Sequence, residues 1–160
     1  LSFLARWNGQ TYGDFPFSVA QHSILVEKIF TKSFPGIEKK WRLASLLHDA
    51  AEYVISDMIS PLKSHLGPSY DNIDISLTRA IHIRFGIPGD LPGKIKMNIK
   101  KADKKAAWLE AKNLAGFSFK EVVAIFGKFD DIELIKEDII PKNPLTAREL
   151  FLKKFYEIYD

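Results

Sequence analysis

The 160-residue sequence contains no cysteine. Disulfide bonds and thiolate-bound metals are therefore excluded, so any metal ion must be held by His, Asp, Glu or water. A chain without cysteine also fits a reducing compartment, and we expect a cytoplasmic protein. The sequence has no run of about 18 apolar residues and no signal-peptide pattern over Leu1–Trp7. We therefore expect neither a membrane span nor a cleaved leader.

A strong charge of either sign is also missing. The chain has 23 Lys and Arg against 20 Asp and Glu, which gives a net charge of +3. This small excess is weak support for a nucleic-acid partner, and we do not expect one. A basic pocket for a phosphate-bearing small molecule, or a solvated lysine-rich surface, accounts for it equally well. No Gly-rich phosphate loop is present, so phosphate would have to be held by a metal ion, Arg or Lys.

Sustained alternation of apolar and polar residues, which is typical of strands, is absent as well. Between clusters of Gly and Pro, apolar residues recur every three or four positions, and this spacing predicts helices. Ser18 is the predicted N-cap of the first helix. The expected helices cover Val19–Phe30, Ile37–Val54, Tyr70–Phe85, Lys94–Leu114, residues 118–127 and 131–139, and a last helix that Thr146 caps and that reaches Tyr159. The sequence thus predicts an all-α fold, a compact single-domain bundle of about six or seven helices spanning residues 1–160.

The most informative segment is Leu46-Leu47-His48-Asp49-Ala50-Ala51-Glu52. Ionisable side chains within an apolar run are costly to bury unless they are paired or bound to metal. On the predicted helix, His48 and Asp49 can converge on an ion beside the helix, and Glu52 follows one turn later. A His-Asp pair is common by chance, however, and does not by itself define a site.

Two further residues extend the pattern. His22 lies in the first predicted helix, and Asp103 lies between Ala102 and Ala106 in the fourth. Alone, each is an ordinary structural residue. Together with His48 and Asp49 they supply two imidazoles and two carboxylates, a donor set that suits divalent manganese, iron, cobalt, nickel or zinc.

The order His…His-Asp…Asp resembles that of the HD-domain phosphohydrolase superfamily, and most closely the bacterial YfbR-like 5′-deoxynucleotidases. The supporting segments are Arg6-Trp7, Ser18 to Ser23 around His22, His48 to Glu52 followed by Asp57 and Ser60 to Lys63, and Ala102-Asp103-Lys104. The match runs from about Arg6 to Leu114 and thins afterwards. It departs from the pattern at Gln21, where relatives often carry Glu. The resemblance implies the helical fold of HD domains.

The resemblance also implies roles for individual residues. His22, His48, Asp49 and Asp103 would hold one divalent cation, whether manganese, cobalt, nickel, iron, zinc or magnesium. Glu52 would orient or deprotonate the attacking water, and Asp57 would lie near the sugar or the nucleophile. The expected substrate contacts are Arg6, Trp7, Lys63 and Lys104.

The function expected from this resemblance is metal-dependent hydrolysis of a nucleotide phosphoester. We expect a 5′-deoxynucleoside monophosphate to give deoxynucleoside and phosphate. A triphosphohydrolase is the nearest alternative, with a basic cluster formed by Lys63, Lys100, Lys101, Lys104 and Lys105. Hydrolysis of an alarmone is less favoured, because that family carries Glu-Asp where this chain reads Glu52-Tyr53. A non-catalytic nucleotide- or RNA-binding HD protein is the alternative outside enzymes, and a homodimer stays open.

Overall fold

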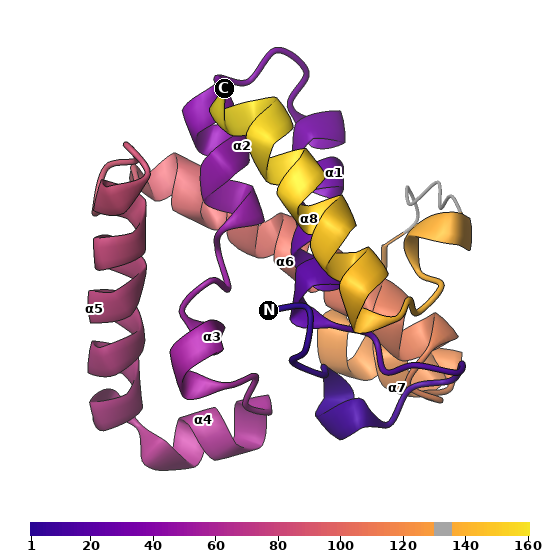
Figure 1. The fold of residues 1–160 in the computed structure, drawn as a ribbon. Helices are drawn as coiled ribbons and strands as arrows, with labels where there is room; N and C mark the ends of the chain where they lie inside the picture. The colour runs from indigo at the N-terminus through magenta and orange to yellow at the C-terminus, as the bar shows by residue number, and fades with distance from the viewer. Residues whose placement is uncertain (130–135) are drawn as a thin grey trace.

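The helices begin and end at residues whose chemistry accounts for most of the boundaries. The computed structural model describes residues 1–129 and 136–160, and within these ranges it contains eight α-helices and two short 3₁₀ helices (Figure 1). The elements are η1 (Trp7–Gly9), α1 (Val19–Ser33), α2 (Lys39–Leu46), α3 (Glu52–Ile55), α4 (Ser60–Leu66), α5 (Pro68–Arg84), α6 (Gly93–Asn113), α7 (Phe119–Phe126), η2 (Lys136–Asp138) and α8 (Pro144–Tyr159). Over the described residues the only strand-like pairing is a bridge between Ala5 and Ser18. The prediction of an all-α bundle is confirmed.

The start of α1 follows the sequence prediction. The Ser18 side chain accepts a hydrogen bond from the backbone N–H of Gln21 and so caps the helix. Leu4 and Leu1 carbonyls accept from the N–H groups of Val19 and Ala20. The first turn of the helix that carries His22 is therefore anchored to the N-terminal segment.

The predicted helix Ile37–Val54 is wrong as a single element. Helix α2 ends at Leu46, and residues 47–51 form hydrogen-bonded turns before α3 begins at Glu52. The bonds there run from residue i+3 to residue i, as from the Glu52 N–H to the Asp49 carbonyl at 3.1 Å. These turns are tighter than an α-helix, yet they keep a spacing of three between apolar residues. His48 and Asp49 accordingly lie in the turns and not on a helix.

Three further boundaries differ from the prediction. Helix α4 was not foreseen; it is separated from α5 by Gly67, whose φ of 58° is a conformation that glycine adopts without strain. Helix α8 begins at Pro144 with Asn143 as its cap, and the Asn143 side chain accepts from the Thr146 N–H at 2.9 Å. The expected piece at 131–139 lies partly outside the described residues, which show only η2 there.

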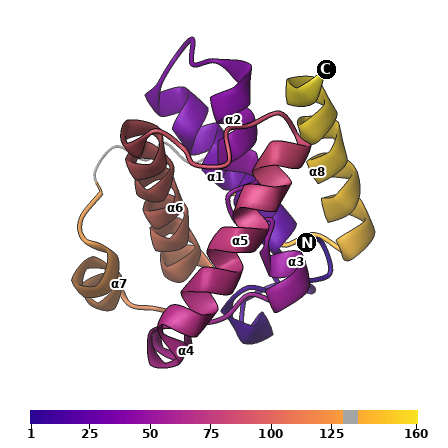
Figure 2. The ribbon, with the colours of Figure 1, turned by 90° about the vertical axis from the view of Figure 1, so that its left-hand side faces the viewer.

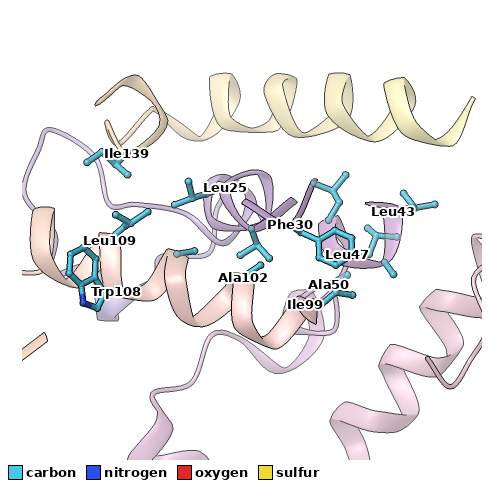
Figure 3. Packing of buried hydrophobic residues seen from close by; sticks show 14 of the residues in the cluster. Leu25, Phe30, Leu43, Leu47, Ala50, Ile99, Ala102, Trp108, Leu109 and Ile139 are labelled. Atoms are coloured by element: carbon cyan, nitrogen blue, oxygen red, sulfur yellow. The ribbon is translucent and has the colours of Figure 1, made fainter. Parts of the chain in front are cut away.

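The core lies between α1, α2, α6 and α8. Figure 3 shows Leu25 and Phe30 of α1 between α8 and the α6 residues Ile99 and Ala102. Trp41 and Trp108 are buried as predicted, and Phe155 and Ile158 of α8 complete this core while Tyr156 stays exposed.

Helix α5 lies at the outside of this bundle, joined to α3 through α4 (Figures 1 and 2). Its predicted apolar face is largely unburied, because Ile73, Ile75 and Ile83 are exposed. Only Tyr70 and His82 of this helix are fully buried. None of the helices in the described ranges has both the length and the apolar character that crossing a bilayer requires.

Candidate metal centre

Four side chains from three separate segments converge in the interior. The Nε2 atom of His22 in α1 lies 3.2 Å from Asp103 Oδ1 in α6 and 3.4 Å from Asp49 Oδ2. The Nε2 atom of His48 lies 3.2 Å from the same Asp49 oxygen and 3.9 Å from Asp103 Oδ1. The predicted ligands His22, His48, Asp49 and Asp103 are thus brought together, and ligand atoms of His22, His48 and Asp103 lie within 4.8 Å of one another.

The Nδ1 atom of each imidazole contacts an acceptor that holds the ring. His22 Nδ1 lies 2.5 Å from Glu110 Oε1, and His48 Nδ1 lies 2.9 Å from the Ser45 carbonyl. An acceptor at Nδ1 places the proton there and leaves the lone pair on Nε2. The two Nε2 atoms are buried, and among the described residues neither has a hydrogen-bond partner. The arrangement suits imidazole ligands of a cation.

The donor set fits a divalent cation. Two nitrogens and two carboxylates without any thiolate match borderline divalent metals. Burial disfavours charge on the His22 ring, yet Glu110, Asp103 and Asp49 raise its pKa well above the usual value. Burial likewise opposes ionisation of Asp49, but His48 and His22 hold its pKa well below the usual value. The carboxylates therefore stabilise positive charge at this point, whether it is carried by protons or by a metal ion.

Glu110 is the site residue that the sequence did not reveal. It is fully buried in α6 and accepts hydrogen bonds from Arg6 Nε at 2.8 Å and Trp7 Nε1 at 2.9 Å, in addition to its contact with His22. Burial alone would raise its pKa, but Arg6 and His22 lower it to about 2. A signal was available: Glu110 follows Asp103 by two helical turns, on the same face, and is flanked by Leu109 and Ala111.

Arg6 and Trp7 both lie at the site, as predicted. Arg6 Nη1 is 3.7 Å from Asp49 and 3.8 Å from Asp57, too far for hydrogen bonds. Asp57 lies near the site, where its charge acts on both Arg6 and Glu52. The Trp7 ring packs against Phe117 with 5.6 Å between centroids. Trp7 has a φ of 56°, strained for a bulky residue, and strain of this kind is found at functional sites.

Glu52 is buried beside the four predicted ligands. Its Oε1 accepts a hydrogen bond from Lys63 Nζ at 3.2 Å, and its Oε2 is buried without a partner among the described residues. Burial, together with the negative charges of Asp49 and Asp57, raises its pKa to about 8. Lys63 forms this ion pair with Glu52, and its contact with phosphate stays a prediction.

Four of the predicted lysines, Lys100, Lys101, Lys104 and Lys105, lie on α6. Lys104 is exposed and makes no hydrogen bond or ion pair with a described residue. Lys105 lies over the Phe129 ring, whereas Lys100 borders a cavity beside His48. Gln21 donates to the Ile140 carbonyl and accepts from the Lys142 N–H. An ionised Glu could not make the first of these bonds.

No family model matches the sequence. The chain is 55% identical over 156 residues to an uncharacterised protein of Rhodobacter capsulatus, covering 98% of this chain and 80% of that protein. It is 25% identical over 142 residues to YfdR, an uncharacterised protein of Escherichia coli, covering 89% of this chain and 71% of YfdR. Neither name states an activity.

Proposed function

We propose that this chain is a metal-dependent phosphohydrolase of the HD type that acts on nucleotide phosphoesters. By sequence it belongs to the family of the Rhodobacter capsulatus protein. The preferred substrate is a 5′-deoxynucleoside monophosphate. The observation that carries the proposal is that the Nε2 atoms of His22 and His48, which have no hydrogen-bond partner among the described residues, lie beside two carboxylates. An acceptor at Nδ1 holds each imidazole ring in this orientation. His22, His48, Asp49 and Asp103 would hold the cation, which when bound supplies Lewis-acid activation of water and of the phosphoryl group.

Arg6 is the residue that binds the phosphate. Glu110 fixes the guanidinium through Nε, and the outer nitrogens make no hydrogen bond with a described residue, although Nη1 lies 3.7 Å from Asp49. Arginine presents two parallel donors to a phosphate group. The hydrogen bond from the Trp7 indole to Glu110 holds this segment in place against the backbone strain at Trp7.

Glu52 is the residue that moves the proton. Hydrolysis forms a bond from water oxygen to phosphorus and breaks the bond to the sugar oxygen, so water loses a proton and the leaving oxygen gains one. A buried carboxyl group beside the predicted ligands can take and return that proton. Its Oε2 has no hydrogen-bond partner among the described residues, and Lys63 orients the other oxygen.

We propose the monophosphate in preference to the triphosphate because few of the lysines expected to form a basic cluster lie at the cavity beside the metal centre. Of those five lysines only Lys100 borders the cavity, where Lys96 lies one turn before it on α6. Two exposed lysines are few for a triphosphate, which carries about four negative charges at neutral pH.

The test is phosphate release from mono-, di- and triphosphates with manganese, cobalt, nickel, magnesium and zinc. We expect inorganic phosphate from deoxynucleoside monophosphates, whereas tripolyphosphate from triphosphates would establish the alternative. Glu52→Gln should lower kcat at least about 100-fold while the metal content by elemental analysis stays unchanged. Glu149→Gln, at an exposed position of α8, is the matched control. Nucleotide binding without release of any phosphate would favour the non-catalytic alternative and overturn the proposal.

A further inference from the structure

A cavity of about 310 Å³ lies next to the metal centre, and His48 belongs to both. Its other walls come from α5, from the loop of residues 87–91 and from the first half of α6. Its volume lies at the lower end of the range of small-molecule sites, enough for one nucleoside. A substrate whose phosphate lies at the metal centre would have this cavity directly beside it.

The cavity combines apolar walls with polar and charged groups. Ile75 of α5, Leu91 of the loop and Ile99 of α6 supply apolar surface from three sides. Arg79 is paired with Asp90 at 2.9 Å, and both side chains are more than half exposed. The other charged residues of the lining are the half-buried Asp74 and the exposed Lys96 and Lys100. The apolar walls suit the flat ring of a base.

His82 gives the cavity a specific polar feature. The residue is only 2% exposed and lines the cavity, and both of its ring nitrogens are buried without a hydrogen-bond partner among the described residues. The backbone of Pro88 and Gly89 lies close to the ring and works to raise the pKa of His82, but burial has the larger effect. Burial lowers the pKa of His82. The ring is thus neutral near pH 7 and offers one donor and one acceptor.

We propose that this cavity binds the nucleoside part of the substrate, with His82 and Thr78 hydrogen-bonding the polar edge of the base. A base presents donors and acceptors side by side on a flat ring, which a neutral imidazole complements. Thr78 is half-buried on α5, lines the same cavity one turn before His82, and can act as donor or acceptor. The inference rests on the proposed function, because it names the substrate group held beside the same centre.

The test is calorimetric titration of the four deoxynucleosides into the manganese-loaded protein, which requires no turnover. His82→Leu should weaken nucleoside binding at least tenfold, and His82→Gln, which keeps a donor and an acceptor, should restore much of it. Thr78→Trp fills the cavity from a half-exposed position and should abolish binding. His65→Leu removes an exposed imidazole outside the cavity and is the matched control.

Wild-type binding by both His82→Leu and Thr78→Trp would overturn the inference. If His82→Leu does not fold, as judged by circular dichroism, the nucleoside binding of Thr78→Trp alone tests the inference. Position 78 is half-exposed and can accept a larger side chain. Failure of the proposed function gives a different result. In that case the wild-type protein releases no phosphate from any nucleotide, while the effect of the two substitutions on nucleoside binding still decides whether the cavity is a nucleoside site.

Discussion

At the scale of single residues, Glu110 determines how the site is held. One buried carboxylate bonds His22, Arg6 and Trp7, so it orients a predicted metal ligand and both members of the predicted Arg-Trp pair. Mutation of a residue that hydrogen-bonds a metal-ligating histidine commonly lowers the metal affinity about 10- to 100-fold.

Glu110→Gln should weaken both metal binding and stability. Removing one member of a buried ion pair leaves its partners uncompensated, which costs about 3 kcal/mol of unfolding free energy. Urea denaturation of the metal-free protein at pH 7 measures this loss, and a manganese titration measures the affinity. An unchanged midpoint of denaturation, equal to that of Glu149→Gln, would show that Glu110 does not hold the site together.

The same residue predicts a dependence on pH. The unfolded chain takes up a proton at Glu110 near pH 4.5, whereas the folded protein keeps this group ionised down to about pH 2. Its contribution is therefore complete above pH 4.5 and is lost as the pH falls towards 2. The stability difference between wild type and Glu110→Gln should shrink over this interval. A difference that stays constant from pH 5 to pH 2.5 would contradict the assignment.

The metal ligands could be proposed from one sequence because their types and order form a pattern. Glu110 and His82 were not proposed. Glu110 had one signal, its place two turns after Asp103 between apolar neighbours, but that spacing does not show which groups the side chain would contact, and His82 had no such signal. Only the fold reveals their surroundings. Lys104 was placed at the site by a motif; its side chain is exposed and makes no hydrogen bond or ion pair with a described residue, so its contact with substrate stays a prediction.

At the scale of elements, local signals located α1 well and the segment after α2 poorly. The Ser18 side chain accepts a hydrogen bond from the backbone N–H of Gln21, three residues later. A contact this local can be predicted from the sequence. The turns at residues 47–51 keep the apolar spacing, but their hydrogen bonds join residues three apart instead of four, so periodicity cannot separate them from a helix. The exposed isoleucines of α5 show the same limit: spacing predicts a face but not what covers it.

Ser18→Ala should destabilise the protein by about 1 kcal/mol, because the first turn of α1 loses its side-chain cap. For a chain of this length, that loss lowers the melting temperature by about 2–4 °C. Ser76→Ala lies in the exposed middle of α5, where the hydroxyl bonds only the Asn72 carbonyl, and should change it little. Equal melting temperatures for wild type and Ser18→Ala would refute the role of the cap.

At the scale of the whole molecule, the centre joins segments that are distant in sequence. Its predicted ligands come from residue 22, residues 48–49 and residue 103, so a bound cation would link α1, the turns after α2 and α6. A ligand that binds only the folded state stabilises it according to its concentration above the dissociation constant.

Manganese at about 1,000 times its dissociation constant should therefore raise the melting temperature by about 10 °C. Asp103→Ala should abolish this rise, and elemental analysis should find the variant without metal. Asp14→Ala, at an exposed loop position, should keep both. A full manganese-dependent rise in Asp103→Ala would exclude Asp103 from the ligands.

The side chains of the centre form a gradient of exposure: His22 is 0% exposed, His48 11%, Asp49 22% and Asp103 38%. The carboxylates of Asp49 and Asp103 are the most exposed members of the centre, whereas the His22 ring is closed off by protein. A cation that binds here would therefore reach the centre from the side of the carboxylates. On the proposed function, a phosphate group approaching from that same side would cover the bound ion and slow its removal by a chelator.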